Sequence, residues 1–102
     1  GNQQKTIVGR WLAQPCRLLI LDEPFQGVDI QARRDIGAHI RRTATERATL
    51  VLVAELDEAL EIADRILVMH EGAIVGEHLN QFPDLTAILA QMTGETTKTR
   101  AA

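Results

Sequence analysis

The predicted fold is decided by one stretch of the chain, Leu18-Leu19-Ile20-Leu21-Asp22-Glu23-Pro24. Four consecutive apolar residues favour a strand that is buried on both faces, as a central strand of a parallel sheet is. Pro24 ends the strand. Asp22 and Glu23 therefore stand at its carboxyl end, the edge at which parallel α/β sheets bind ligands, and are candidates to hold a metal ion or an attacking water. Acidic residues after a strand also occur as ordinary turn residues, so this stretch alone leaves both interpretations open.

Composition narrows the class of protein. A chain of 102 residues suits one domain. Its net charge of −3 argues against a broad nucleic-acid interface. A single cysteine, Cys16, excludes an internal disulfide. No apolar run approaches the roughly 20 residues that cross a bilayer, so we expect a soluble, cytoplasmic domain.

Hydrophobic spacing predicts alternating helices and strands along the rest of the chain. Apolar positions 7, 8, 11 and 12 indicate a first helix with one buried face, anchored by Trp11. Further helices are expected over 30–45, 56–63 and 84–92, and strands over 49–54, 66–69 and 73–77, the last two joined by a hairpin turn at Glu71-Gly72. Residues 1–93 thus form an α/β domain, a mostly parallel sheet flanked by helices with a C-terminal hairpin and helix, and residues 94–102 form a disordered tail.

The buried faces of the later helices can also be predicted. The helix over 30–45 places four small or branched apolar residues on its inner face, and the helix over 84–92 places four apolar residues on one side: Ala32, Ile36, Ile40 and Ala44, and Leu85, Ile88, Leu89 and Met92. Charged residues are expected on solvated helix faces, namely the arginine pairs 33–34 and 41–42 and the acids Glu55, Asp57, Glu58 and Glu61. Asp57 or Glu58 could in addition favour the first turn of its helix.

Three motifs in order resemble one family. Gly1-Asn2-Gln3-Gln4-Lys5 resembles the second half of the signature motif of ABC ATPases, Leu21-Asp22-Glu23-Pro24 their Walker B segment, and Gly27-Val28-Asp29 their D-loop. The 21 positions from Gly1 to Asp22 match the spacing expected in that family. Together with residues 63–72, the first motif is similar to the second ATPase half of tandem sugar importers of the ribose, xylose and galactose type. The resemblance covers roughly residues 1–80 and implies the C-terminal part of a P-loop NTPase domain.

The resemblance implies a role for each matched residue. Asp22 would hold Mg²⁺ through water, and Glu23 would act as the general base of ATP hydrolysis. The signature residues would complete an ATP site in the partner ATPase half, and the D-loop would face that half: Gly1, Asn2 and Gln3, and Gly27 and Asp29. The implied cofactors are ATP and Mg²⁺.

Two departures from the family pattern affect the expected activity. The sequence contains no Gly-x-x-x-x-Gly-Lys-[Ser/Thr] phosphate loop. We therefore expect the chain to be a fragment of a longer subunit and inactive as an ATPase by itself. The second departure is Ala54, which occupies the position of the family's switch histidine. The missing histidine suggests that Glu23 lies in a weakened site, while the signature residues serve the active one.

Three function classes follow. The leading one is the ATP-binding subunit of a sugar ABC importer, an ATPase at the cytoplasmic face of the inner membrane. Its implied partners are the other ATPase half, the transmembrane permease subunits and, indirectly, a periplasmic sugar-binding protein, with no nucleic acid. The alternative is a soluble ABC ATPase of the DNA-repair or translation-factor type, which the acidic composition and the sugar-importer motifs disfavour. The third is an inert structural fragment.

Two further expectations concern side chains outside these motifs. His39, His70 and His78 share no evident face and favour solvated surface over a metal site. Buried parallel strands without neighbours expose edges and apolar faces, so the isolated chain is expected to self-associate.

Overall fold

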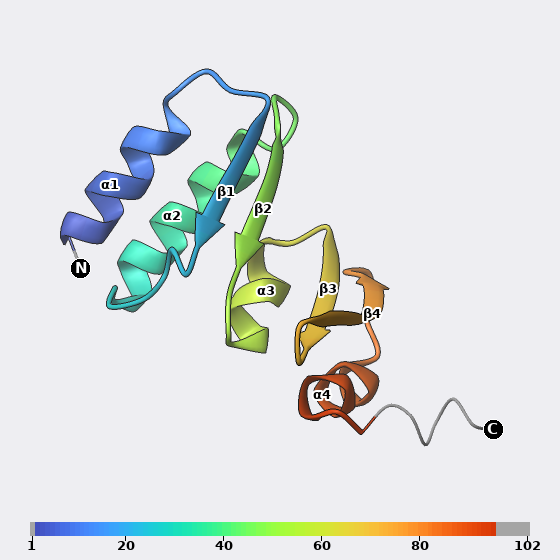
Figure 1. Ribbon diagram of the computed structural model, residues 1–102. Helices are drawn as coiled ribbons and strands as arrows, with labels where there is room; N and C mark the ends of the chain where they lie inside the picture. The colour runs from blue at the N-terminus through green and yellow to red at the C-terminus, as the bar shows by residue number, and fades with distance from the viewer. Residues whose placement is uncertain (1, 96–102) are drawn as a thin grey trace. The chain divides into compact units, whose positions relative to one another are not determined.

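The computed structural model describes residues 2–95, apart from the side chains of Asn2, Gln3 and Lys5 (Figure 1). These residues divide after Ile62 into two compact units. The first unit contains α1 (Asn2–Leu12), β1 (Leu18–Asp22), α2 (Ile30–Arg42), β2 (Ala48–Leu52) and α3 (Leu56–Ile62). The second unit contains β3 (Arg65–His70), β4 (Ala73–Leu79) and α4 (Leu85–Thr93). Each helix of residues 2–95 is too short or too polar to cross a bilayer.

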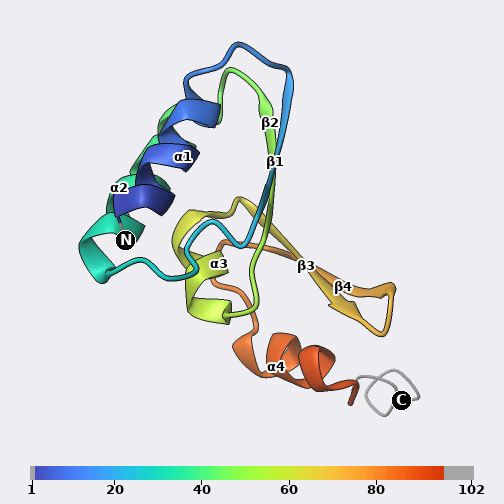
Figure 2. The ribbon, with the colours of Figure 1, turned by 60° about the vertical axis from the view of Figure 1, so that its left-hand side comes forward.

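The first unit is built on a parallel pair of strands. β1 and β2 run side by side in register from Leu18 opposite Ala48 to Asp22 opposite Leu52. Helices α1 and α2 both lie on one side of these strands (Figure 2). The buried cluster between helices and strands comprises Val8, Leu12, Leu19, Leu21, Phe25, Ile36, Ile40 and Ile62. The predicted parallel pairing is thus confirmed.

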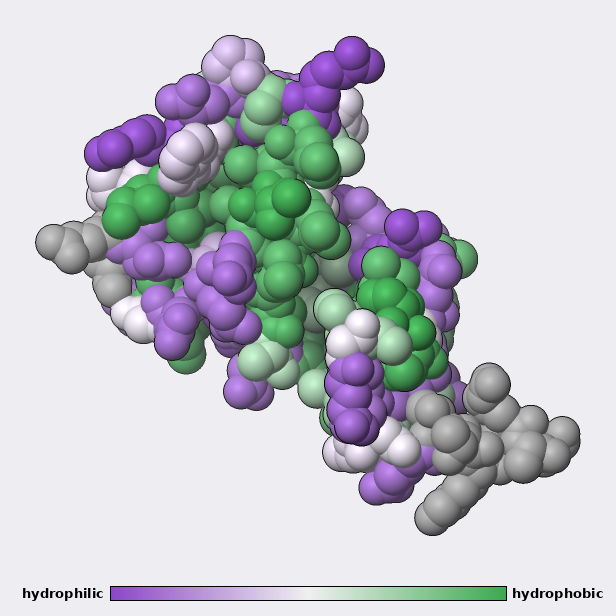
Figure 3. Space-filling model, viewed as in Figure 1, coloured by the Kyte–Doolittle hydropathy of each residue, from purple (hydrophilic) through white to green (hydrophobic). Residues whose placement is uncertain are grey.

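The prediction that β1 is buried on both faces is wrong for the part of the chain that the structure describes. Leu19 and Leu21 are buried, whereas Leu18 and Ile20 are 58% and 57% exposed. Leu50 and Leu52 of β2 are also exposed, at 48% and 40%. Because both described helices that pack on the strands do so from one side, the opposite apolar face has no cover in this unit. Figure 3 shows the resulting hydrophobic band over the two strands.

The first two helices match the predicted spacing only in part. Val8 and Leu12 of α1 are buried. Trp11, although it belongs to the same apolar pattern, is 55% exposed, so it is not a core anchor. In α2 the buried residues are Ala32, Ile36, Gly37 and Ile40. The helix ends at Arg42, with Thr43 as its C-cap, so Ala44 lies beyond the helix rather than on its inner face.

The second unit is a β-hairpin covered by one helix. Glu71 and Gly72 both have positive φ, 49° and 80°, as the tight turn between β3 and β4 requires. The predicted hairpin is therefore confirmed, and with the parallel pair it makes the chain an α/β protein with mixed strand pairing. Ile66 and Val68 of β3 are buried with Ile88 of α4, which is 1% exposed.

The last helix buries less than its spacing predicted. Of the four apolar residues predicted to share one side, Ile88 is buried, while Leu85 and Leu89 are about half exposed. The helix therefore packs on the hairpin mainly through Ile88. Asp84 caps the first turn by accepting from the amide of Ala87 at 3.1 Å. Gly94 ends the helix in the left-handed conformation, with φ 86°. The remainder of the predicted tail, residues 96–102, lies outside the described residues.

Candidate functional site

The carboxyl ends of β1 and β2 meet at one edge of the first unit. Asp22 is the last residue of β1 and is exposed, while Glu23 follows it and is half-buried. The Glu23 amide donates to the Leu52 carbonyl at 2.8 Å, so the pairing of the strands extends to this residue. Ala54, at the position predicted for the switch histidine, follows β2 and is exposed. The parallel register thus places the two acids at the edge where the segment after β2 also emerges.

The backbone of Glu23 is in the left-handed region, with φ 53°. This conformation is unfavourable for a residue with a side chain and persists where surrounding contacts hold it. Two contacts do so directly. The Glu23 amide is bonded to Leu52, and the Glu23 carbonyl accepts from the amide of Gln26 at 3.3 Å. The edge thus has an exposed carboxylate, Asp22, followed by the half-buried carboxylate of Glu23, whose backbone is strained. This pair makes the edge the candidate site.

The loop after Glu23 leads directly into α2. The Val28 amide donates to the Phe25 carbonyl at 3.3 Å, and Gly27 has φ 76°, a conformation that glycine adopts at little cost. Asp29 is the N-cap of α2: its Oδ1 accepts from the Ala32 amide at 2.7 Å. Asp29, which the motif resemblance assigns to a D-loop, therefore already has one carboxylate oxygen engaged within its own chain.

Helix α1 begins at Asn2, so the signature-like segment stands at the first turn of that helix. Gly1 and the side chains of Asn2 and Gln3 lie outside the described part of the structure. The side chain of Gln4 is described, and its Nε2 donates to the carbonyl oxygen of Pro24 at 3.0 Å. This bond joins α1 to the loop that carries Glu23, across 20 positions of sequence.

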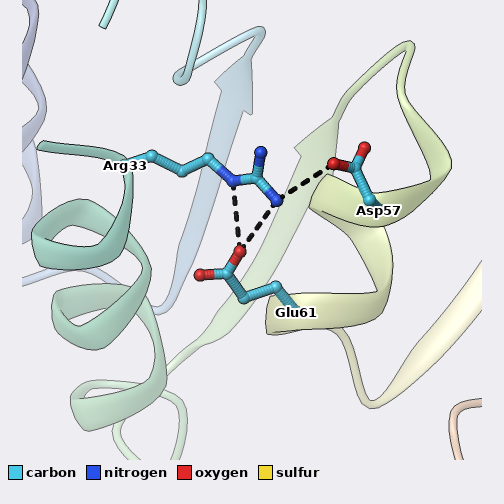
Figure 4. Close-up of polar contacts among 3 residues, drawn as sticks. All are labelled: Arg33, Asp57 and Glu61. Atoms are coloured by element: carbon cyan, nitrogen blue, oxygen red, sulfur yellow. Dashed lines mark hydrogen bonds and ion pairs between the residues drawn. The ribbon is translucent and has the colours of Figure 1, made fainter. Parts of the chain in front are cut away.

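An arginine of α2 links this helix to α3 within the first unit (Figure 4). Arg33 Nη2 lies 2.9 Å from Glu61 Oε2 and 3.3 Å from Asp57 Oδ2. Desolvation alone would lower the pKa of the guanidinium, but the hydrogen bond and charge of Glu61, followed by those of Asp57, raise it overall. The predicted face keeps solvent contact, since the Arg33 side chain is 25% exposed. The sequence did not predict that Asp57 and Glu61, one turn apart on α3, would both face Arg33.

Glu58 is electrostatically connected to the strand edge. Partial burial raises the pKa of the Glu58 carboxyl, and the positive charge of Arg33 opposes this shift. Negative charge on nearby carboxylates, that of Glu23 before those of Asp57 and Glu55, raises the pKa further. The charge of Glu23, directly after β1, therefore acts on Glu58 in α3.

The raised pKa of Glu58 predicts how stability depends on pH. Because the folded state binds the Glu58 proton more tightly than the unfolded state, this group favours folding at acidic pH. That contribution is fully present below the unfolded pKa of about 4.3 and is lost as pH rises through the raised value. We expect Glu58→Gln to remove this dependence and to leave stability at pH 7 equal or higher, in urea unfolding measured at pH 4.5 and 7. The matched variant Glu46→Gln, at an exposed turn, should keep the wild-type dependence; equal behaviour of the two variants would contradict the prediction.

No three metal-binding side chains converge within the described residues. His39 is exposed on α2, but His78 is half-buried and its Nε2 lies 2.6 Å from Gln91 Oε1, so it is not simply solvated. His70 Nε2 lies 3.2 Å from Glu71 Oε2. Cys16 is a half-buried free thiol that accepts from Arg47 Nη1 at 3.2 Å.

Sequence reasoning did not identify three residues that shape this edge. The sequence predicts solvated positions for Arg33 and Glu58, and it indicates Gln4 only as a part of the first motif. A signal existed for a cation near α3, since the like charges of Asp57 and Glu61 at i and i+4 repel each other unless a positive charge lies between them. No sequence signal indicates the Gln4 bond, because its acceptor is a main-chain carbonyl.

Comparison with known proteins gives a consistent result. The chain is 50% identical over 78 residues to the arabinose import ATP-binding protein AraG of Pseudomonas savastanoi pv. phaseolicola, a match that covers 76% of the chain and 15% of that protein. It is 41% identical over 95 residues to the ribose import ATP-binding protein RbsA of Geobacillus kaustophilus, covering 92% of the chain and 19% of that protein. For AraG 1 of Burkholderia lata, identity is 42% over 104 residues, covering 100% of the chain and 21% of that protein.

This chain is homologous to the sugar-import ATP-binding proteins. The resemblance inferred from the motifs is thereby confirmed. The chain spans only 15–21% of the length of these sugar-import relatives. No protein-family model matches it.

Proposed function

We propose that this chain forms the C-terminal part of the second ATPase half in the ATP-binding subunit of a sugar importer, within a P-loop NTPase fold. The observation that carries the proposal is the edge of β1, where an exposed Asp22 is followed by a half-buried Glu23 held in a left-handed conformation. Two adjacent carboxylates with different environments suit two different roles. Homology to arabinose and ribose import ATP-binding proteins supports the same assignment.

Asp22 is suited to bind a magnesium ion. Mg²⁺ retains several waters and takes one or two carboxylates together with substrate phosphates, so a single exposed carboxylate at a strand end is sufficient. When bound with ATP, the ion neutralises charge on the phosphates. Asp22 would hold it there through water.

Glu23 is suited to act as the general base. Its carboxylate would orient a water toward the γ-phosphorus and accept the proton that this water loses as the bond to the bridging oxygen of ADP breaks. The strand pairing of its amide and the bond to its carbonyl fix its backbone, and so limit the directions in which its side chain can point.

Two further segments would meet the partner ATPase half. The first turn of a helix has amides without partners inside the helix, so the start of α1 would suit a phosphate bound by that half. The D-loop residues Gly27 and Asp29 would face the same half. Ala54 cannot supply the imidazole of a switch histidine. The site containing Glu23 would therefore be the weaker of the two.

The subunit would work at the cytoplasmic face of the membrane, beside permease subunits that receive sugar from a periplasmic binding protein. This chain alone would not turn over ATP.

Turnover by the full-length polypeptide that carries this chain tests the assignment. Loss of a general base typically costs a factor of about 10²–10⁴. We expect the matching glutamate-to-glutamine change in the other half to have an effect of this size, and Glu23→Gln to lower ATP turnover less than about tenfold. Glu46→Gln, an exposed residue away from the strand edge, is the matched control and should leave turnover unchanged.

The possible outcomes separate the two parts of the proposal. Equal losses from Glu23→Gln and from the change in the other half would disprove the asymmetry while leaving the ATPase assignment intact. If neither change lowered ATP turnover, the assignment itself would be disproved.

A further inference from the structure

The loop after β1 is held by a series of carbonyl bonds. Three successive carbonyls, those of Glu23, Pro24 and Phe25, each accept a hydrogen bond. Two of the donors, the amides of Gln26 and Val28, belong to the loop itself and lie three positions along the chain. The donor to the middle carbonyl is the side chain of Gln4, which comes from α1.

The surroundings make this bond a restraint on Glu23. Pro24 is among the residues whose side chains are essentially fully buried, and Phe25 is 4% exposed, so both are fixed against the core. The peptide between them can reorient only if its carbonyl leaves Gln4. That peptide is the second one after the left-handed Glu23 and is joined to it through the rigid ring of Pro24, so its position constrains the strained Glu23 backbone.

We propose that Gln4 is a positioning residue that couples the first turn of α1 to the loop carrying Glu23. This inference rests on the proposed function, in which α1 serves the nucleotide of the partner half and Glu23 serves the nucleotide of this half. Through the Gln4–Pro24 bond, a displacement of the first turn of α1 is passed to the Glu23 backbone, and the two nucleotide sites shift together.

The test uses the full-length polypeptide and two readouts. The first readout is hydrogen exchange of the amides of Gln26 and Val28. Gln4→Glu keeps the side-chain length but removes the donor, and Gln4→Ala removes the side chain. Both should speed exchange at these amides about fivefold, the factor that corresponds to one net hydrogen bond. Gln4→Lys retains a donor and should exchange more slowly than either.

The second readout is ATP hydrolysis, which a merely structural bond would not change selectively. We expect Gln4→Glu to lower kcat about fivefold and to leave KM for ATP within about twofold, since Gln4 contacts no nucleotide in the proposed arrangement. Gln31→Ala is the matched control, because its side chain bonds only along the exposed face of α2, to Asp35. It should change neither readout.

The outcomes distinguish this inference from the proposed function. Unchanged exchange in both Gln4→Glu and Gln4→Ala would overturn the restraint. Faster exchange with unchanged kcat would overturn the link to catalysis. If changing Glu23 and the corresponding glutamate of the other half leaves turnover intact, the proposed function fails, even where the Gln4 variants still speed exchange.

Discussion

Replacing Ile36 by alanine is expected to lower the free energy of unfolding of this chain by about 2–5 kcal/mol. Ile36 lies in the middle of α2, is 2% exposed and belongs to the buried cluster of the first unit. Removing three carbons there costs their transfer free energy and leaves a gap that the surrounding side chains fill only in part. Urea unfolding followed by far-UV circular dichroism measures the change.

The same substitution at the start of the same helix is the control. Ile30 is 66% exposed, so Ile30→Ala should change stability by no more than about 0.5 kcal/mol. Similar losses from Ile36→Ala and Ile30→Ala would mean that the described core of the first unit does not stabilise the chain.

Placing charge on the open face of the β1–β2 pair is expected to weaken self-association of the isolated chain at least tenfold. Ile20 and Leu50 are opposite each other in the parallel register, and both are exposed. Covering them removes apolar surface from water, so the isolated chain should associate through this face. The double variant Ile20→Lys/Leu50→Lys adds like charges at the centre of the face, and sedimentation velocity over a concentration series measures the shift toward single chains.

An exposed isoleucine away from this face provides the comparison. Ile30→Lys introduces the same charge on α2 and should leave association unchanged. A wild-type chain that sediments as a monomer at every concentration would disprove the prediction. So would a double variant that associates as strongly as the wild type.

The local signals of the sequence predicted the elements well. The hairpin at Glu71-Gly72 follows from turn residues that accept positive φ, and the helix after Asp29 follows from its periodic apolar pattern. Both depend on neighbours within a few positions, so the sequence contains the whole cause. The position of Asp22 and Glu23 after a strand is of the same kind.

The roles of several side chains were not available from such signals. Arg33 binds Asp57 and Glu61, which lie 24 and 28 positions away, and Gln4 binds a carbonyl 20 positions away. A charge or an amide in the sequence has many possible partners, and only the packing of one element on another selects among them. The wrong expectation for Trp11 has the same origin, since periodicity gives a stripe but not which half of the stripe faces the core.

The sequence by itself determined the order and type of the elements, the family and the two carboxylates at a strand end, because these depend on local pattern and motif spacing. Only the tertiary structure decided which face of β1 is covered, how Glu23 is held in its left-handed conformation, and which helix restrains the loop after it. These features are set by contacts between segments distant in sequence, whose energies depend on geometry that no local pattern encodes.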